Sequence, residues 1–354
     1  GQGVDPADVE QRDDYVWATV TTLGQKAQTV LSDLLPEMIG KLNFGKTMRW
    51  HSDGVAFPRP LRWLVALFGD QVIPFTYARA TSGRISRGLR PDKSPEIELA
   101  SASDYQAQME KADILVDREK RRETIWTMVS EKASELGGVV KDDPDLLDEV
   151  TDLVEAPHAL GGAFDEKHLA LPSEVLISVM KKHQRYFPVF DTDGKLMPCF
   201  ITVSNGKPSD PDLVVRGNEG VVRARYADAE FFFKDDTQKK LEDFLSRLDT
   251  LTFQEKLGSM RDKSLRVEKL VADLADDLGL VGEDLETSVR AATLCKADLA
   301  TSMVVEMTSL QGVIGRYYAL ASGESEAVAT AIEGHYHPRF PGDSIPDTLP
   351  GLAV

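Results

Sequence analysis

The stretch LPSEVLISVMKKHQRYFPVFDTDGKLMPCFITVSN, residues 171–205, carries the strongest structural signals of this 354-residue chain. Ser173 and Glu174 are typical of a helix start, because serine accepts from free backbone amides and an acid favours the positive end of the helix dipole. Apolar spacing predicts a helix to about Lys182. Two β-branched and aromatic runs, 186–190 and 197–204, then flank an Asp-Gly turn. The stretch therefore predicts a helix, a basic tip and a hairpin.

Local clusters of cations are candidates for phosphate binding, because Lys and Arg donate charge-assisted hydrogen bonds to phosphate oxygens. The first cluster is the basic tip of the predicted helix. The second lies in a Gly- and Ser-rich segment, TSGRISRGLRP, which we expect to be a flexible loop that orders on a sugar-phosphate backbone or is simply mobile. The third lies on a predicted helix before Phe231. The candidate residues are Lys181, Lys182, His183, Arg185, Arg84, Arg87, Arg90, Arg223 and Arg225.

The order of predicted elements indicates an α+β fold followed by a helical region. Apolar residues at three- and four-residue steps predict packing helices over 1–43, with Pro36 as a break. Helices alternate with paired strands over 44–207. A helical connector over 208–250 and a helical domain over 251–354 complete the chain, with long helices expected at 264–278, 284–321 and 325–336.

Composition limits the function classes. The net charge of −17 argues against binding nucleic acid through overall charge, so any RNA contact must come from the local clusters. The two cysteines, Cys199 and Cys295, lie far apart in apolar segments and are expected to be reduced core residues. No apolar run reaches the roughly 18 residues of a membrane span. The chain starts without Met and ends within an apolar segment, so we expect a fragment of a longer protein.

Several segments resemble the β subunit of glycyl-tRNA synthetase of the bacterial and organellar type. Residues 171–205 contain three of its sequence motifs: LPxEVL, the basic HQRYFPVF and FIxVSN. Further matching segments follow in the family's order: MRW at 48–50, RPLRWLVALFGD at 59–70, LVEAP at 153–157, GNEGVVRARYADAEFFFKDD at 217–236, FQEKLGSMRDK at 253–263 and KADLATSMVVEMTSLQGVIGRYYA at 296–319.

The resemblance implies a tRNA-binding and scaffold part of glycine–tRNA ligase. Its partners would be tRNA-Gly and a catalytic α subunit, or an α-like domain of a fused chain, in an α2β2 or fused dimeric assembly. ATP and Mg²⁺ would be held by the α part, so no cofactor, metal or aminoacylation site is expected in this segment. The location would be the bacterial cytoplasm, or a chloroplast or mitochondrion. The sequence of residues 89–100 favours an organelle.

The resemblance also implies that the helical domain is of the HD type, named for a metal-binding His-Asp pair. Here Lys296 stands where the imidazole is expected, ahead of Asp298, and a protonated lysine cannot ligate a metal. Two alternatives stay open: an HD-type metal phosphohydrolase using Asp298, His335 and His337, and a structural module that binds a protein without touching RNA. The histidines are two residues apart, so they do not share one helical face.

Overall fold

The computed structural model describes residues 4–5, 7, 9–18, 23–90 and 92–354. It is 49% helical and 17% strand, with a helical C-terminal region, which confirms the predicted α+β class. The chain divides into two compact units, Gly1–Val116 and Asp117–Val354. This division lies inside the segment predicted as one α+β domain over 44–207.

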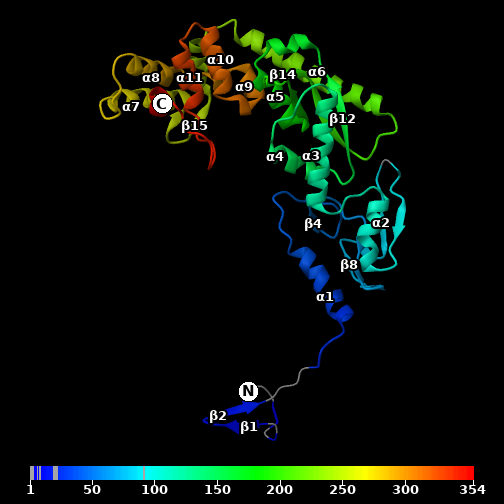
Figure 1. The fold of residues 1–354 in the computed structure, drawn as a ribbon. Helices are drawn as coiled ribbons and strands as arrows, with labels where there is room; N and C mark the ends of the chain where they lie inside the picture. Colours follow the sequence, from blue (N-terminus) through cyan, green and yellow to red (C-terminus); the bar gives the residue numbers. More distant parts are fainter. Residues whose placement is uncertain (1–3, 6, 8, 19–22, 91) are drawn as a thin grey trace. The chain divides into compact units, whose positions relative to one another are not determined.

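The described residues of unit 1 form short strands and two α-helices (Figure 1). The hairpin β6–β7 turns at Gly69 and Asp70, and β9 pairs with both β5 and β8. The segment expected as a flexible loop instead forms β9 and β10, so that prediction was wrong. The elements are β1 (Val9–Arg12), β2 (Tyr15–Ala18), α1 (Ala27–Gly40), β3 (Met48–Arg49), β4 (Ala56–Phe57), β5 (Leu64–Val65), β6 (Leu67–Phe68), β7 (Gln71–Val72), β8 (Thr76–Tyr77), β9 (Ala80–Gly83), β10 (Ile85–Arg87), β11 (Glu96–Glu98) and α2 (Tyr105–Lys111).

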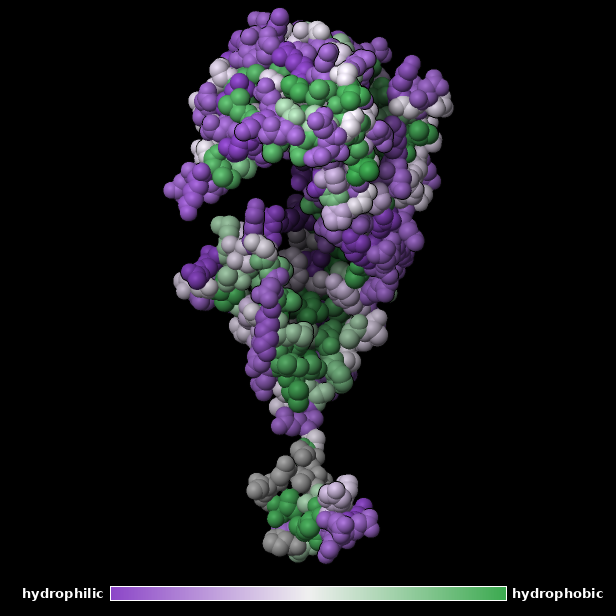
Figure 2. All heavy atoms as spheres, turned by 90° about the vertical axis from the view of Figure 1, so that its left-hand side faces the viewer, coloured by the Kyte–Doolittle hydropathy of each residue, from purple (hydrophilic) through white to green (hydrophobic). Residues whose placement is uncertain are grey.

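The N-terminal segment differs from the predicted packing helices. An antiparallel hairpin, β1–β2, occupies residues 9–18, and Arg12 pairs with Tyr15 across its turn. Pro36 lies inside α1 rather than ending it, and none of the side chains of α1 is buried. Val30, Leu34 and Met38 are 42%, 46% and 53% exposed. Figure 2 shows apolar side chains gathered on the face of unit 1 that it draws.

Unit 2 begins with a three-stranded antiparallel sheet in the order β12-β14-β13 (Figure 1). Alternate residues of β14 point to opposite faces, as strand geometry requires. Cys199 and Ile201 join the core made with α3 and α4, while Phe200 joins the larger core made with α5 and α6. The sheet elements and their helices are α3 (Arg118–Glu135), α4 (Pro144–Leu153), β12 (Pro157–Ala163), α5 (Ser173–Ser178), β13 (Phe187–Phe190), β14 (Leu196–Asn205) and α6 (Pro211–Asp236).

The predicted hairpin at 186–204 is therefore confirmed as β13–β14. The Asp191 carboxylate accepts from the backbone amides of Asp193 and Lys195, both at 2.9 Å, and Gly194 has φ of +80°, which suits a residue without a Cβ. Gly162 lies opposite Phe200 on the neighbouring strand, and a Cβ there would come within 2.5 Å of the phenyl ring.

The C-terminal part of unit 2 is helical and shares the larger core. The long helix expected over 284–321 is instead broken, because Thr301 and Gly312 start new helical segments. Two short strands, β15 and β16, precede these helices, at the start of the segment predicted as a helical domain over 251–354. The elements are β15 (Thr252–Gln254), β16 (Gly258–Ser259), α7 (Met260–Asp273), α8 (Glu283–Leu294), α9 (Ser302–Glu306), α10 (Val313–Ala321), α11 (Glu326–Gly334) and α12 (Leu349–Ala353).

Asp236, the last residue of α6, links this helix to the helical part. It is 2% exposed, and its carboxylate accepts from the amides of Ser302 and Met303 at 3.0 and 2.9 Å and from the Tyr318 hydroxyl at 3.0 Å. These three bonds satisfy the buried charge and cap the start of α9. Among the described residues, no helix has both the length and the apolar character needed to cross a membrane.

Candidate nucleic-acid interface

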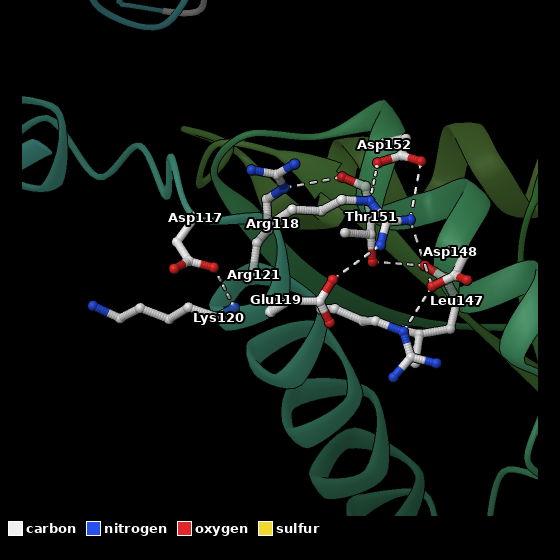
Figure 3. A network of polar contacts seen from close by, with 10 residues as sticks. Asp117, Arg118, Glu119, Lys120, Arg121, Leu147, Asp148, Thr151 and Asp152 are labelled. Atoms are coloured by element: carbon white, nitrogen blue, oxygen red, sulfur yellow. Dashed lines mark hydrogen bonds and ion pairs between the residues drawn. The ribbon is translucent and has the colours of Figure 1, made fainter. Parts of the chain in front are cut away.

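The acidic helix α4 forms ion pairs with several cations of unit 2. Figure 3 shows Arg118 forked onto Asp152, with Nε and Nη2 at 2.8 and 3.1 Å from the two carboxylate oxygens. Arg122 donates to Asp148 at 2.7 Å. Bidentate pairs of this kind fix geometry as well as charge. The hydrogen bonds and charge of Arg118 lower the pKa of Asp152. The pairs join α3 to α4.

The basic tip is held by a buried helix. α5 continues as a π-helical turn, Val179–Gln184, in which Val179 and Met180 are fully buried. The turn ends at Arg185 in the left-handed conformation, with φ of +57°. The Tyr186 amide then donates to the Met180 carbonyl at 2.9 Å, which closes the helix end. No side chain caps the start of α5; the Ser173 hydroxyl donates to Glu174 instead, so the predicted serine cap is wrong.

Two of the four predicted tip residues are engaged by α4. Lys181 forms an ion pair with Asp143. Arg185 donates through Nε to Glu149 at 2.7 Å, and its Nη1 donates to the Lys182 carbonyl at 2.9 Å. Their charge is partly neutralised within the protein, so they fix the shape of the tip.

The other two tip residues are exposed and form no ion pair with a described residue. Desolvation is the main cause that lowers the pKa of Lys182, and repulsion by the charges of Arg339 and Lys181 lowers it further, which shows that these cations lie nearby. Desolvation also leads in lowering the pKa of His183, followed by the charges of Arg225, Arg185 and Lys182. The structure thus brings cations from three distant segments of unit 2 together. We call Lys182, His183, Arg225 and Arg339 the tip cluster.

The tip cluster is not purely cationic. A cavity of about 60 Å³ beside it is lined by His183 and Arg225 and also by Asp228 and Glu306. Arg339 donates to the His337 ring at 2.9 Å, and that ring faces Asp343 at 3.2 Å. These acids lie beside the cations and limit where an anion can approach.

Arg223 lies on α6 but on a different side of the helix from Arg225, and both are exposed. Neither forms an ion pair with a described residue. Both side chains therefore face outward. Whether either touches RNA stays a prediction.

The three arginines predicted in unit 1 have different surroundings. Arg84 donates to three backbone carbonyls, those of Leu99 at 3.0 Å, Ala100 at 3.2 Å and Asp70 at 2.9 Å. Arg87 pairs with Glu96 at 2.7 Å. Arg90 is exposed and forms no ion pair with a described residue. Arg84 and Arg87 are thus held in place by contacts with the strands and turns of unit 1. Of the three arginines, Arg90 is the one whose guanidinium has no partner among the described residues.

The HD-like position forms a buried polar cluster. The Lys296 ammonium lies 2.6 Å from Nε2 of His335, and His335 Nδ1 lies 2.5 Å from the Ile332 carbonyl. Nδ1 therefore carries the ring proton, and Nε2 accepts from Lys296, so the nitrogen that would bind a metal faces a lysine. Asp298 is fully buried and accepts from the Gly312 amide at 2.6 Å.

Burial sets the charge of this cluster. It raises the pKa of Asp298 to about 6 and lowers that of His335 to about 3, with Lys296 lowering the latter further. His337, the third residue of the phosphohydrolase hypothesis, contacts Arg339 and Asp343 instead. Within the described part of the chain, no group of three or more His, Cys, Asp or Glu side chains is arranged to hold a metal ion.

Sequence reasoning missed Arg339. It lies in an irregular segment, far along the chain from Lys182, and no periodicity or motif connects the two. Only the packing of the C-terminal segment near the helix tip brings them within electrostatic reach.

These observations describe a mixed α+β chain in which a buried helix presents cations at its tip and a helical region supports it. The chain belongs to the glycyl-tRNA synthetase beta subunit family, whose model matches residues 1–354. It is 47% identical over 343 residues to the glycine–tRNA ligase beta subunit of Clostridioides difficile, covering 97% of this chain and 50% of that protein. The same subunit of Synechocystis is 43% identical over 361 residues, covering 100% and 50%. The chain thus spans about half the length of the curated relatives it matches.

Proposed function

We propose that this chain is the tRNA-binding and scaffold part of a glycine–tRNA ligase, and that the tip cluster contacts the phosphates of tRNA-Gly. The observation that carries the proposal is the convergence of Lys182, His183, Arg225 and Arg339 in a chain of net charge −17. Holding like charges together is unfavourable, and an anionic partner removes that cost. Membership of the beta subunit family supports the choice of RNA as the anion.

The partners follow from the same family. The name of the relatives implies an α subunit, which we propose as the holder of ATP, Mg²⁺ and the aminoacylation site, in an α2β2 or fused dimeric assembly. The relatives named above are bacterial, which supports a location in the cytoplasm rather than in the organelle that the sequence of residues 89–100 favoured.

A binding titration tests the proposal. The chain is titrated with tRNA-Gly and an unrelated tRNA by filter binding at several salt concentrations, with and without an α subunit. Binding that weakens steeply with salt supports direct phosphate contacts. Binding to the α subunit with no tRNA binding at low salt rejects the RNA role and identifies a protein-binding scaffold.

A further inference from the structure

A second feature of unit 2, apart from the tip cluster, is a cavity of about 710 Å³. It lies between the β13–β14 turn, the residues leading into α5, and side chains of α6 and α10. A smaller cavity of about 230 Å³ adjoins it through the shared residues Lys141, Ile177 and Phe190. None of the tip-cluster residues lines the larger cavity, which we call the lysine-rimmed cavity.

Most of the lining is apolar and part of it is aromatic. Leu171, Leu176 and Phe190 are buried core residues, and Phe233 and Tyr317 add aromatic rings from two other helices. Cavities of 300–1,000 Å³ with apolar walls and a few polar groups are the usual form of ligand sites. The size admits a single aromatic ring system with a polar substituent.

The charged groups on the lining are of one sign. Among the described residues that line the lysine-rimmed cavity, the charged ones are Lys141 and Lys195. The chain has 58 acidic residues against 41 Lys and Arg, yet none of the described residues that line this cavity is an acid, whereas Asp142 and Asp143 line the adjoining smaller one. The Lys141 ammonium lies 3.9 Å from the centre of the Phe190 ring and 3.5 Å from the Gly194 carbonyl. Lys195 is exposed and forms no ion pair with a described residue.

Glu174, which follows the lining residue Ser173 in the sequence, is engaged in hydrogen bonds. Glu174 accepts from the Tyr317 hydroxyl at 2.9 Å and from the Ser173 hydroxyl at 3.2 Å. These hydrogen bonds hold the carboxylate beside the two hydroxyls. Neither Lys141 nor Lys195 forms an ion pair with a described carboxylate, so the charge of both lysines is left for an incoming anion, although Lys141 also contacts the Gly194 carbonyl.

An apolar, partly aromatic wall with two lysines at its rim fits a ligand that joins a flat ring to a phosphate. We propose that the lysine-rimmed cavity binds one unstacked nucleotide, with the base against the apolar wall and the phosphate at Lys141 and Lys195. Aromatic stacking and a cationic rim are the two means by which proteins hold single-stranded nucleotides without reading sequence. This inference rests on the proposed RNA-binding function and adds a second, single-stranded contact to it.

Two sources supply this chemistry: a free mononucleotide, or an unpaired nucleotide of an RNA. The probes are therefore adenosine 5′-monophosphate, an RNA hairpin with a short single-stranded 3′ overhang, and the same hairpin with a blunt end. Calorimetry or fluorescence anisotropy measures each against the chain.

Two variants of different kinds address the site. Lys141→Met combined with Lys195→Met removes the charges and keeps the apolar stems. Ala170→Trp fills the cavity from its exposed rim without changing charge. Lys207→Met combined with Lys256→Met is the matched control, because both lysines are exposed and neither lines the cavity. Circular dichroism checks that every variant is folded.

The overhang hairpin should bind the parent chain about tenfold or more tighter than the blunt hairpin, as expected for one or two charge-assisted contacts with stacking. Both site variants should remove that difference, and the control should keep it. Adenosine monophosphate binding with the same variant pattern assigns the site to a free nucleotide as well.

Equal binding of both hairpins by the parent, with no mononucleotide binding, overturns the inference. So does a loss of the same size in the control. Binding of an acidic aromatic peptide in place of either nucleotide probe overturns it in favour of protein docking. Failure here is distinguishable from failure of the proposed function, because salt-dependent binding of whole tRNA-Gly through the tip cluster would persist in both site variants.

Discussion

Arg84 provides a sharp test of whether a predicted cation serves the fold or the RNA. Its guanidinium donates to the carbonyls of Leu99, Ala100 and Asp70, which ties the end of β11 to the β6–β7 turn. Arg84→Met removes three bonds. The bond to Leu99 is partly buried and leaves a carbonyl unsatisfied, while the other two are solvent-exposed and worth less. We expect a loss of about 3 kcal/mol in the free energy of opening of unit 1.

Hydrogen exchange with mass spectrometry measures this locally. In the variant, the free energy of opening of peptides covering 96–109 should be about 3 kcal/mol lower than in the parent chain. Peptides of β12–β14 serve as the internal reference. Arg90→Met is the matched control, because Arg90 is exposed, and its effect should stay below about 0.5 kcal/mol. Unchanged exchange in Arg84→Met, together with weaker tRNA binding, would refute the structural role and return Arg84 to the RNA contacts.

Three further changes test the core of unit 2. Asp236→Ala leaves two amides and the Tyr318 hydroxyl without their acceptor and should cost about 3 to 5 kcal/mol in urea unfolding, whereas a cost below about 1 would contradict the capping role. Gly162→Ala places a methyl group against the Phe200 ring and should cost about 2 kcal/mol; a neutral effect would mean that the ring moves freely. Burial raises the pKa of Asp298 to about 6, so its proton adds stability that is complete below about pH 4 and lost as pH rises through 6. Relative to Asp298→Asn, the parent should gain about 2 kcal/mol in the free energy of unfolding between pH 6 and 4, and a pH-independent difference would contradict this.

Local signals explain which elements were predictable. The hairpin at 187–205 has its turn encoded in neighbouring residues, since Asp191 and Gly194 supply the side-chain acceptor and the positive φ. The N-terminal hairpin was missed because apolar residues over 1–43 also recur at helical spacing. The β-branched and aromatic run Tyr15, Val16 and Trp17 was the signal for a strand there.

The candidate interface was predictable in composition but not in detail. The sequence identifies Lys181 and Arg185 as cations, yet their carboxylate partners lie more than 30 residues away, at the N-cap of α4 and on α4 itself. The charge of Arg339 acts on Lys182 from still farther along the chain. Which cations are neutralised and which stay available is decided by tertiary packing, and no local pattern records it.

The central claim is that the tip cluster contacts tRNA phosphates. The salt dependence of tRNA-Gly binding should be compared between the parent chain and the variant Lys182→Met, Arg225→Met, Arg339→Met. A control with the same charge change replaces three exposed lysines elsewhere, Lys207, Lys256 and Lys269. The account predicts that the slope of log K against log salt flattens by about 2 to 3 units in the tip variant and stays near the parent value in the control. Equal slopes in the parent and the tip variant would contradict it.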